Sequence, residues 1–113
     1  MFYTCTTLCA LEVHIDDKDL LKLYSGETPR KLRGLPPQVV EKFFAAVQLL
    51  MTANSITDLW KFPGYNFEKL KTKGICSMRL SGKYRLEMEV EWTNTEQTIG
   101  KFTLTAISNH YGD

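Results

Sequence analysis

The sequence has few cysteines, almost no net charge and no long apolar run, and each shortage excludes a class of protein. Three cysteines, Cys5, Cys9 and Cys76, form an odd set without the spacing of a disulfide-stapled scaffold, so we expect reduced thiols in a cytoplasmic protein. A net charge of +1 excludes a nucleic-acid affinity that rests on overall charge. No stretch approaches the ~20 apolar residues of a membrane span, and the first ten residues lack a basic leader, so we expect neither a span nor a signal peptide.

A metal site is also not expected. Cys5, Cys9 and His14 are the available soft ligands near the N-terminus, but a fourth ligand is missing and their spacing matches no familiar zinc site. We therefore expect neither a metal nor another cofactor. With 113 residues, of which 43% are hydrophobic and 24% charged, the chain has the composition of one soluble globular domain spanning residues 1–113.

The first half of the chain predicts one strand followed by helices. Residues 8–15 alternate as a strand does, and Asp16 and Asp17 can cap a short helix that ends near Tyr24. Residues 25–34 are polar and glycine-containing, which favours a loop. Residues 36–53 form the main helix, opened by two prolines, and residues 56–60 add a helical turn. The main helix carries one wide apolar stripe: Val40, Phe43, Phe44, Val47, Leu50 and Met51.

The second half predicts strands only, at residues 67–70, 75–80, 84–92 and 101–107. A strand, two helices and then an antiparallel series of strands indicate an α+β fold, with the helices packed on one face of an antiparallel sheet. The opposite face is then free to meet a ligand.

Cations gather locally although the whole chain is nearly neutral. Between Lys61 and Arg85 the sequence has seven cations against one acid, Glu68. In the predicted hairpin Arg79 shares a face with Ser77, while residues 83, 85, 87 and 89 share a face on the next strand. A sheet face with clustered lysine and arginine is typical of proteins that bind a phosphodiester backbone.

The same stretch resembles a known family. Pro63-Gly64-Tyr65, then Leu70-Lys71, then a hairpin with Arg79 and Arg85 are similar to the HigB branch of the RelE toxin superfamily, the plasmid maintenance killer proteins. The resemblance covers about three quarters of the chain, from the helix at 36–53 to His110 and Tyr111. It implies the RelE-like microbial RNase toxin fold and a cytoplasmic, metal-independent endoribonuclease that cleaves mRNA on the ribosome and inhibits translation. It also implies a partner antitoxin, a helix-turn-helix protein like HigA.

The resemblance also assigns residues. Lys71 matches the family lysine after the leucine, Arg79 and Arg85 match the hairpin arginines, and Tyr111 matches the C-terminal tyrosine. Cleavage by the RNA 2′-hydroxyl needs cations at the phosphate and groups that transfer protons, for which His110 is a further candidate. Further lysines are expected to bind RNA, and they are Lys69, Lys73 and Lys83. The pattern departs from the family at Glu68, where a histidine is common, and at Cys76 and Tyr84, where tryptophans are.

Structural interpretations of the same residues stay open. The three lysines at 69, 71 and 73 have the spacing of a solvated strand face, and the two arginines can form cross-strand ion pairs with Glu87 or Glu89. Trp60, Phe62 and Trp92 are expected to pack in the core or at its edge. If the functional interpretation holds, Lys71, Arg79 and Arg85 should converge on one concave basic surface away from the helices. The alternative function is a RelE-fold protein that binds RNA or a partner protein without cleavage.

Overall fold

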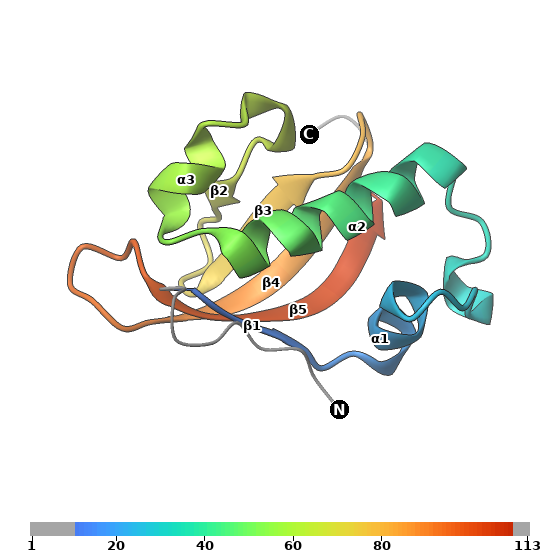
Figure 1. Ribbon diagram of the computed structural model, residues 1–113, viewed down its shortest axis with the longest axis horizontal. Coiled ribbons are helices and arrows are strands. Elements are labelled where there is room, and N and C mark those ends of the chain that lie inside the picture. The colour runs from blue at the N-terminus through green and yellow to red at the C-terminus, as the bar shows by residue number, and fades with distance from the viewer. Residues whose placement is uncertain (1–10, 110–113) are drawn as a thin grey trace.

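The computed structural model describes residues 11–109, which form three helices and a five-stranded mixed sheet (Figure 1). The elements in chain order are β1 (Glu12–Ile15), α1 (Lys18–Tyr24), the 3-10 turn η1 (Arg30–Leu32), α2 (Pro37–Thr52), α3 (Ile56–Trp60), the 3-10 turn η2 (Pro63–Tyr65), β2 (Glu68–Lys69), β3 (Ile75–Arg79), β4 (Tyr84–Trp92) and β5 (Gly100–Asn109).

The strands lie in the order β1-β5-β4-β3-β2. The pairs β5–β4, β4–β3 and β3–β2 are antiparallel, as predicted, and the α+β class is confirmed. The N-terminal strand joins the outer edge and runs parallel to β5, with Val13 opposite Phe102. Residues 8–10 of the predicted first strand lie outside the described residues.

The helices begin where the sequence offers caps. The Asp17 carboxylate accepts a hydrogen bond at 3.0 Å from the backbone N–H of Leu20, the third residue of α1. Pro37 is the first residue of α2, where a missing N–H is tolerated. The Ser55 hydroxyl caps α3 by accepting from the backbone N–H of Thr57. Capping side chains and a proline therefore account for the first residues of all three described helices.

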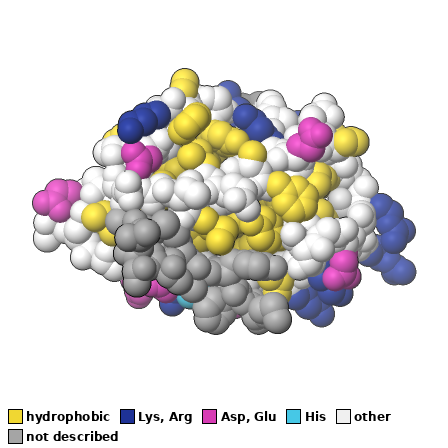
Figure 2. Space-filling model, viewed as in Figure 1, with side chains coloured by type: hydrophobic (Ala, Val, Ile, Leu, Met, Phe, Trp, Pro, Cys, Tyr) yellow, Lys and Arg dark blue, Asp and Glu magenta, His cyan; other side chains and the backbone are white. Residues whose placement is uncertain are grey.

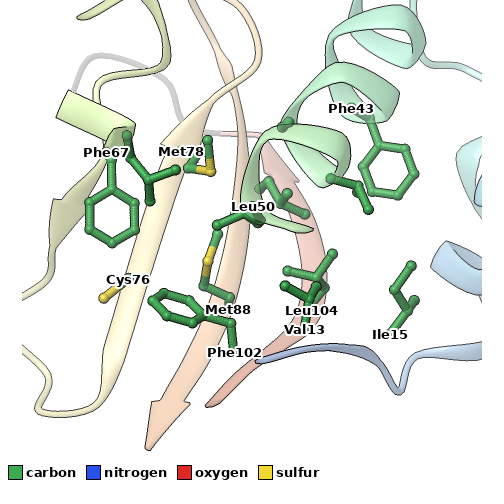
Figure 3. Packing of buried hydrophobic residues seen from close by; sticks show 14 of the residues in the cluster. Val13, Ile15, Phe43, Leu50, Phe67, Cys76, Met78, Met88, Phe102 and Leu104 are labelled. Atoms are coloured by element: carbon green, nitrogen blue, oxygen red, sulfur yellow. The ribbon is translucent and has the colours of Figure 1, made fainter. Parts of the chain in front are cut away.

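The predicted apolar stripe of α2 packs on one face of the sheet. Phe43 and Leu50 are fully buried and point from α2 toward the strands (Figure 3). Below them lie Met78 of β3, Met88 of β4 and Leu104 of β5, which are also fully buried. Burying side chains of this size on both layers stabilises the fold by about 1.5–3 kcal/mol per residue. The sheet face below α2 is thus the core face.

Alternation then places polar side chains on the other face. In β4 the residues at 86, 88 and 90 are buried, whereas Glu89 and Glu91 are exposed. A bulge at Glu87 and Met88 shifts the register against β5, and the Thr105 hydroxyl donates to the Glu87 carbonyl across it. Among the described residues, no helix covers this second face of β3 and β4 (Figure 1).

The aromatic residues divide between the core and the surface. Trp92 packs edge-on against Phe102, with 5.8 Å between ring centroids, as expected for edge packing. The expectation for Trp60 and Phe62 was wrong, because their side chains are 54% and 49% exposed. For Trp60 the reason is the shortness of α3, which buries Ile56 and Leu59 and leaves its opposite side in solvent. Phe62 lies after the end of α3, next to the 3-10 turn η2.

A substitution at Gly100 would test how closely β4 and β5 are paired. A Cβ atom at this residue would lie 2.6 Å from the Glu91 carbonyl oxygen, which belongs to the backbone. Gly100→Ala should therefore lower the free energy of unfolding by about 1–3 kcal/mol, measured by urea denaturation. Gly82→Ala is the control, because no atom lies within 4 Å of the added Cβ. Equal stability of the two variants would contradict this packing.

Candidate nucleic-acid interface

Two rows of side chains cross the helix-free face at one end of the sheet. In the first row Arg79 of β3 is opposite Arg85 of β4, which is opposite Ser108 of β5. In the second row Glu68 of β2 is opposite Ser77 of β3, which is opposite Glu87 of β4. We call the first the arginine row and the second the acidic row.

The arginine row places two like charges side by side. Directly opposed like charges in an antiparallel pair are destabilising. Arg79 is exposed, and among the described residues it has no ion-pair or hydrogen-bond partner. Two neighbouring guanidiniums on an open face are suited to an anion, since each can donate two hydrogen bonds to one phosphate or carboxylate.

Arg85 reaches across the sheet to Glu68. Its Nη1 donates to the Glu68 Oε1 at 2.9 Å, and the arginine side chain is only 17% exposed. Because β3 lies between β2 and β4, this bridge passes over β3 on the face that carries Ser77, whose exposure is 1%. The interpretation that Arg85 pairs with Glu87 or Glu89 was therefore wrong. Its partner is Glu68 on β2, which the Arg85 side chain reaches across β3.

The lysines do not join the arginine row as a group. The Lys69 Nζ lies 4.6 Å from the centroid of the Trp92 ring, and its strand partner is the buried Cys76, so it lies on the helix-bearing side. Lys71 and Lys73 are exposed in the turn before Ile75, at the opposite end of β3 from Arg79. Four residues of strand separate the two ends by ~13 Å. The expectation that Lys71 converges with both arginines was wrong; Lys83, in the turn between β3 and β4, is at their end.

Among the described residues, the cations outside the arginine row are spread over the surface or lie beside acids. On the helix-bearing face, apolar side chains surround α2 and the lysines and arginines lie toward the margins (Figure 2). A hollow of about 450 Å³ lies near the Lys73 end of the helix-free face. Lys73 and Lys101 line it together with Glu89 and Glu91, so its charges balance. The cationic excess is thus local to the arginine row.

The expected proton-transfer groups, His110 and Tyr111, lie outside the described residues. The last described residue of β5, Asn109, is opposite Tyr84. The strand therefore ends at the same end of the sheet as the arginine row. The proton-transfer roles of His110 and Tyr111 stay predictions.

Two other reactive side chains are unsuited to chemistry at neutral pH. Burial raises the pKa of the Cys76 thiol to about 11, against a partial lowering by Lys69. Burial also raises the pKa of the Tyr65 phenol. The Lys42 Nζ lies 4.1 Å from the centroid of the Tyr65 ring, so this tyrosine joins η2 to α2. Both residues therefore have packing roles.

Within residues 11–109, no group of three or more His, Cys, Asp or Glu side chains could hold a metal ion. Cys5 and Cys9 lie outside this range. None of the described helices is long and apolar enough to cross a membrane.

Comparison with known proteins now decides the family. Residues 13–100 match a family model described as the RelE-like toxin of type II toxin-antitoxin system HigB. The chain belongs to this family. Membership makes it a toxin of a type II toxin–antitoxin module, a class that is generally ribonucleolytic and has an antitoxin partner. No curated protein matched the chain.

The match to the HigB-like toxins ends at Gly100, which divides the candidate residues. Lys71, Arg79 and Arg85 lie inside it, whereas His110 and Tyr111 lie beyond it. Sequence reasoning missed the burial of Ser77 and the partner of Arg85. The signal for the second was Glu68, the one acid of the basic stretch, but its pairing depends on a strand order that the sequence does not state.

The Cys76 thiol of this HigB-like toxin should resist alkylation. A pKa of about 11 means that the thiolate appears only as the pH approaches that value. At pH 8 a thiol two units above an ordinary one has a thiolate fraction ~100-fold lower, and burial slows access further. Iodoacetamide labelling followed by peptide mass spectrometry should find Cys76 modified far more slowly in the native than in the urea-unfolded protein. Equal rates would contradict its burial.

Proposed function

We propose that this HigB-like toxin is a metal-independent endoribonuclease that cleaves mRNA engaged on the ribosome and so inhibits translation in the cytoplasm. The observation that carries the proposal is the placement of Arg79 directly opposite Arg85 on the helix-free face. The nucleophile is the 2′-hydroxyl of the RNA itself, so the reaction needs no metal-activated water.

The arginine row supports the charge requirement of that reaction. Attack of the 2′-hydroxyl on the adjacent phosphorus builds negative charge on the phosphate oxygens, and donors fixed around those oxygens lower the barrier. Both arginines lie on paired strands, so their backbone positions are fixed before the reaction begins, and the Arg85 guanidinium is also held by its ion pair with Glu68. Lys83 adds a cation at the same end, and Lys71 and Lys73 would contact neighbouring phosphates of the strand.

Proton transfer is assigned to residues after β5. Tyr111 would exchange a proton with the reacting oxygens, and His110 is the second candidate. A phenol close to two guanidiniums has its anion stabilised, which is what a tyrosine needs to act near neutral pH. Glu68 would be the remaining carrier within the acidic row.

The antitoxin would silence the toxin at this face. A HigA-like helix-turn-helix partner that covers the arginine row, or displaces the segment after β5, would block RNA without any change in the core. A complex that leaves the whole face open would contradict this mode of inhibition.

One observation favours a second candidate, an RNA- or protein-binding member without cleavage. Arg85 is engaged by Glu68, so one of the two guanidiniums is already neutralised. Mapping of cut transcripts separates the candidates, since a binder alone would inhibit growth, if at all, without producing new RNA ends.

Arg79→Ala should abolish toxicity while the fold stays intact. The side chain is exposed and without a described partner, so little stability is lost, whereas removal of one charge-stabilising donor lowers the cleavage rate by about 10²–10³. Growth and transcript ends should be followed after induction without antitoxin. Lys22→Ala, which removes an exposed cation from α1, is the control and should remain toxic. Full toxicity of the arginine variant would remove Arg79 from the site.

Tyr111→Phe should lower the cleavage rate by about 10²–10⁴, the range for loss of a general acid or base. RNA binding should be retained, because the arginines remain. Single-turnover cleavage and equilibrium binding by the purified variant measure the two effects separately. An unchanged rate would transfer the role to His110 or Glu68.

A further inference from the structure

A buried hydroxyl lies beneath the bridge between Arg85 and Glu68. Ser77 is 1% exposed on a sheet face that no described helix covers, and the bridge between Arg85 and Glu68 crosses β3 on this face. Among the described residues its Oγ has no hydrogen-bond partner, and the same holds for Ser108 Oγ at the other side of Arg85. Buried hydroxyls without a partner destabilise a fold, and these two lie beside two guanidiniums, so a ligand bound there could supply the missing hydrogen bonds.

The donors around Ser77 match one ligand class. Arg79, Arg85 and the serine hydroxyl are all hydrogen-bond donors, and all lie on the same face of neighbouring strands. The Glu68 carboxylate, opposite Ser77, accepts from Arg85, which is its only partner within residues 11–109. An oxyanion with several acceptor oxygens, such as a phosphate, can accept from the serine and from both arginines together.

We propose that Ser77, Arg79 and Arg85 form an oxyanion pocket whose place is held by the Glu68 carboxylate until a phosphodiester of RNA displaces it. The inference rests on the proposed function only in naming RNA as the source of the oxyanion. Glu68 is then an internal competitor, which lowers affinity for any anion that lacks further contacts along the strand.

The effect of the competitor can be measured without cleavage. The probe is a fluorescein-labelled 2′-O-methyl RNA octamer, whose blocked 2′-hydroxyls cannot attack, and the readout is fluorescence anisotropy. Glu68→Gln keeps the shape above Ser77 but removes the charge, so it should bind the probe about three- to tenfold more tightly than the unmodified toxin. Glu89→Gln is the matched control, because it removes one exposed carboxylate from the same face of β4 and should give a smaller gain.

Ser77→Ala separates a ligand-binding hydroxyl from a structural one. Removing a hydroxyl without a partner should leave the thermal midpoint of unfolding unchanged or raise it. The affinity for the octamer should fall by about three- to tenfold. A structural role predicts the reverse, with a lower midpoint and unchanged binding. That result would overturn the proposal for Ser77.

Inorganic phosphate tests the oxyanion chemistry directly. It should compete with the octamer at a lower concentration for Glu68→Gln than for Glu89→Gln. Equal competition, or no gain in affinity for Glu68→Gln over its control, would overturn the displacement idea. Loss of cleavage in Glu68→Gln without tighter binding would also overturn it, and would indicate proton transfer by Glu68. If the Glu68 and Ser77 variants bind the octamer as expected but the unmodified toxin cuts no RNA, the oxyanion pocket is supported and the proposed endoribonuclease function is contradicted.

Discussion

The burial of one sheet face beneath α2 is the constraint on which the rest of the molecule depends. Met78 and Leu86 must point toward the helix, so the residues that alternate with them, Arg79 and Arg85, must point away from it. A slip of one residue in the β3–β4 register would turn the arginines into the core and the apolar side chains into solvent. The packing that stabilises the fold therefore also places Arg79 and Arg85 opposite each other on the helix-free face.

Local charge, rather than total charge, explains how a nearly neutral chain can present an anion site. The Glu68 carboxylate offsets the repulsion between the two arginines by drawing Arg85 across β3. The pair is partly exposed, so its contribution to stability is modest, of the order of 1 kcal/mol or less. It engages Arg85 and leaves Arg79 without a partner among the described residues. If the proposed anion site holds, the same ion pair would weaken binding and keep the site for a competing anion.

Much of this fold could be predicted from local pattern, and the candidate site only in part. The alternation from Tyr84 to Val90 identified a half-buried strand, and the caps at Asp17 and Ser55 follow from short-range hydrogen bonds. The error about Lys71 has a geometric cause. The chain reverses direction between β2 and β3, so Lys71 lies in the turn that precedes β3, whereas Arg79 lies at the far end of that strand. The partner of Arg85 was missed for a related reason, because Glu68 reaches it only through the order of three strands.

The placement of Arg79 and Arg85 on paired strands bears on how such a toxin could be controlled. The arginines lie on paired strands whose register the core holds, so they cannot be moved without loss of packing energy. Donors that stabilise a transition state work best when they are held in this way, because no reorganisation is then needed during the reaction. If the proposed site holds, control would act on what occupies the arginine face, where Glu68 already places a carboxylate against Arg85. A partner that silences the toxin there would extend, from outside, a competition that the fold begins on its own.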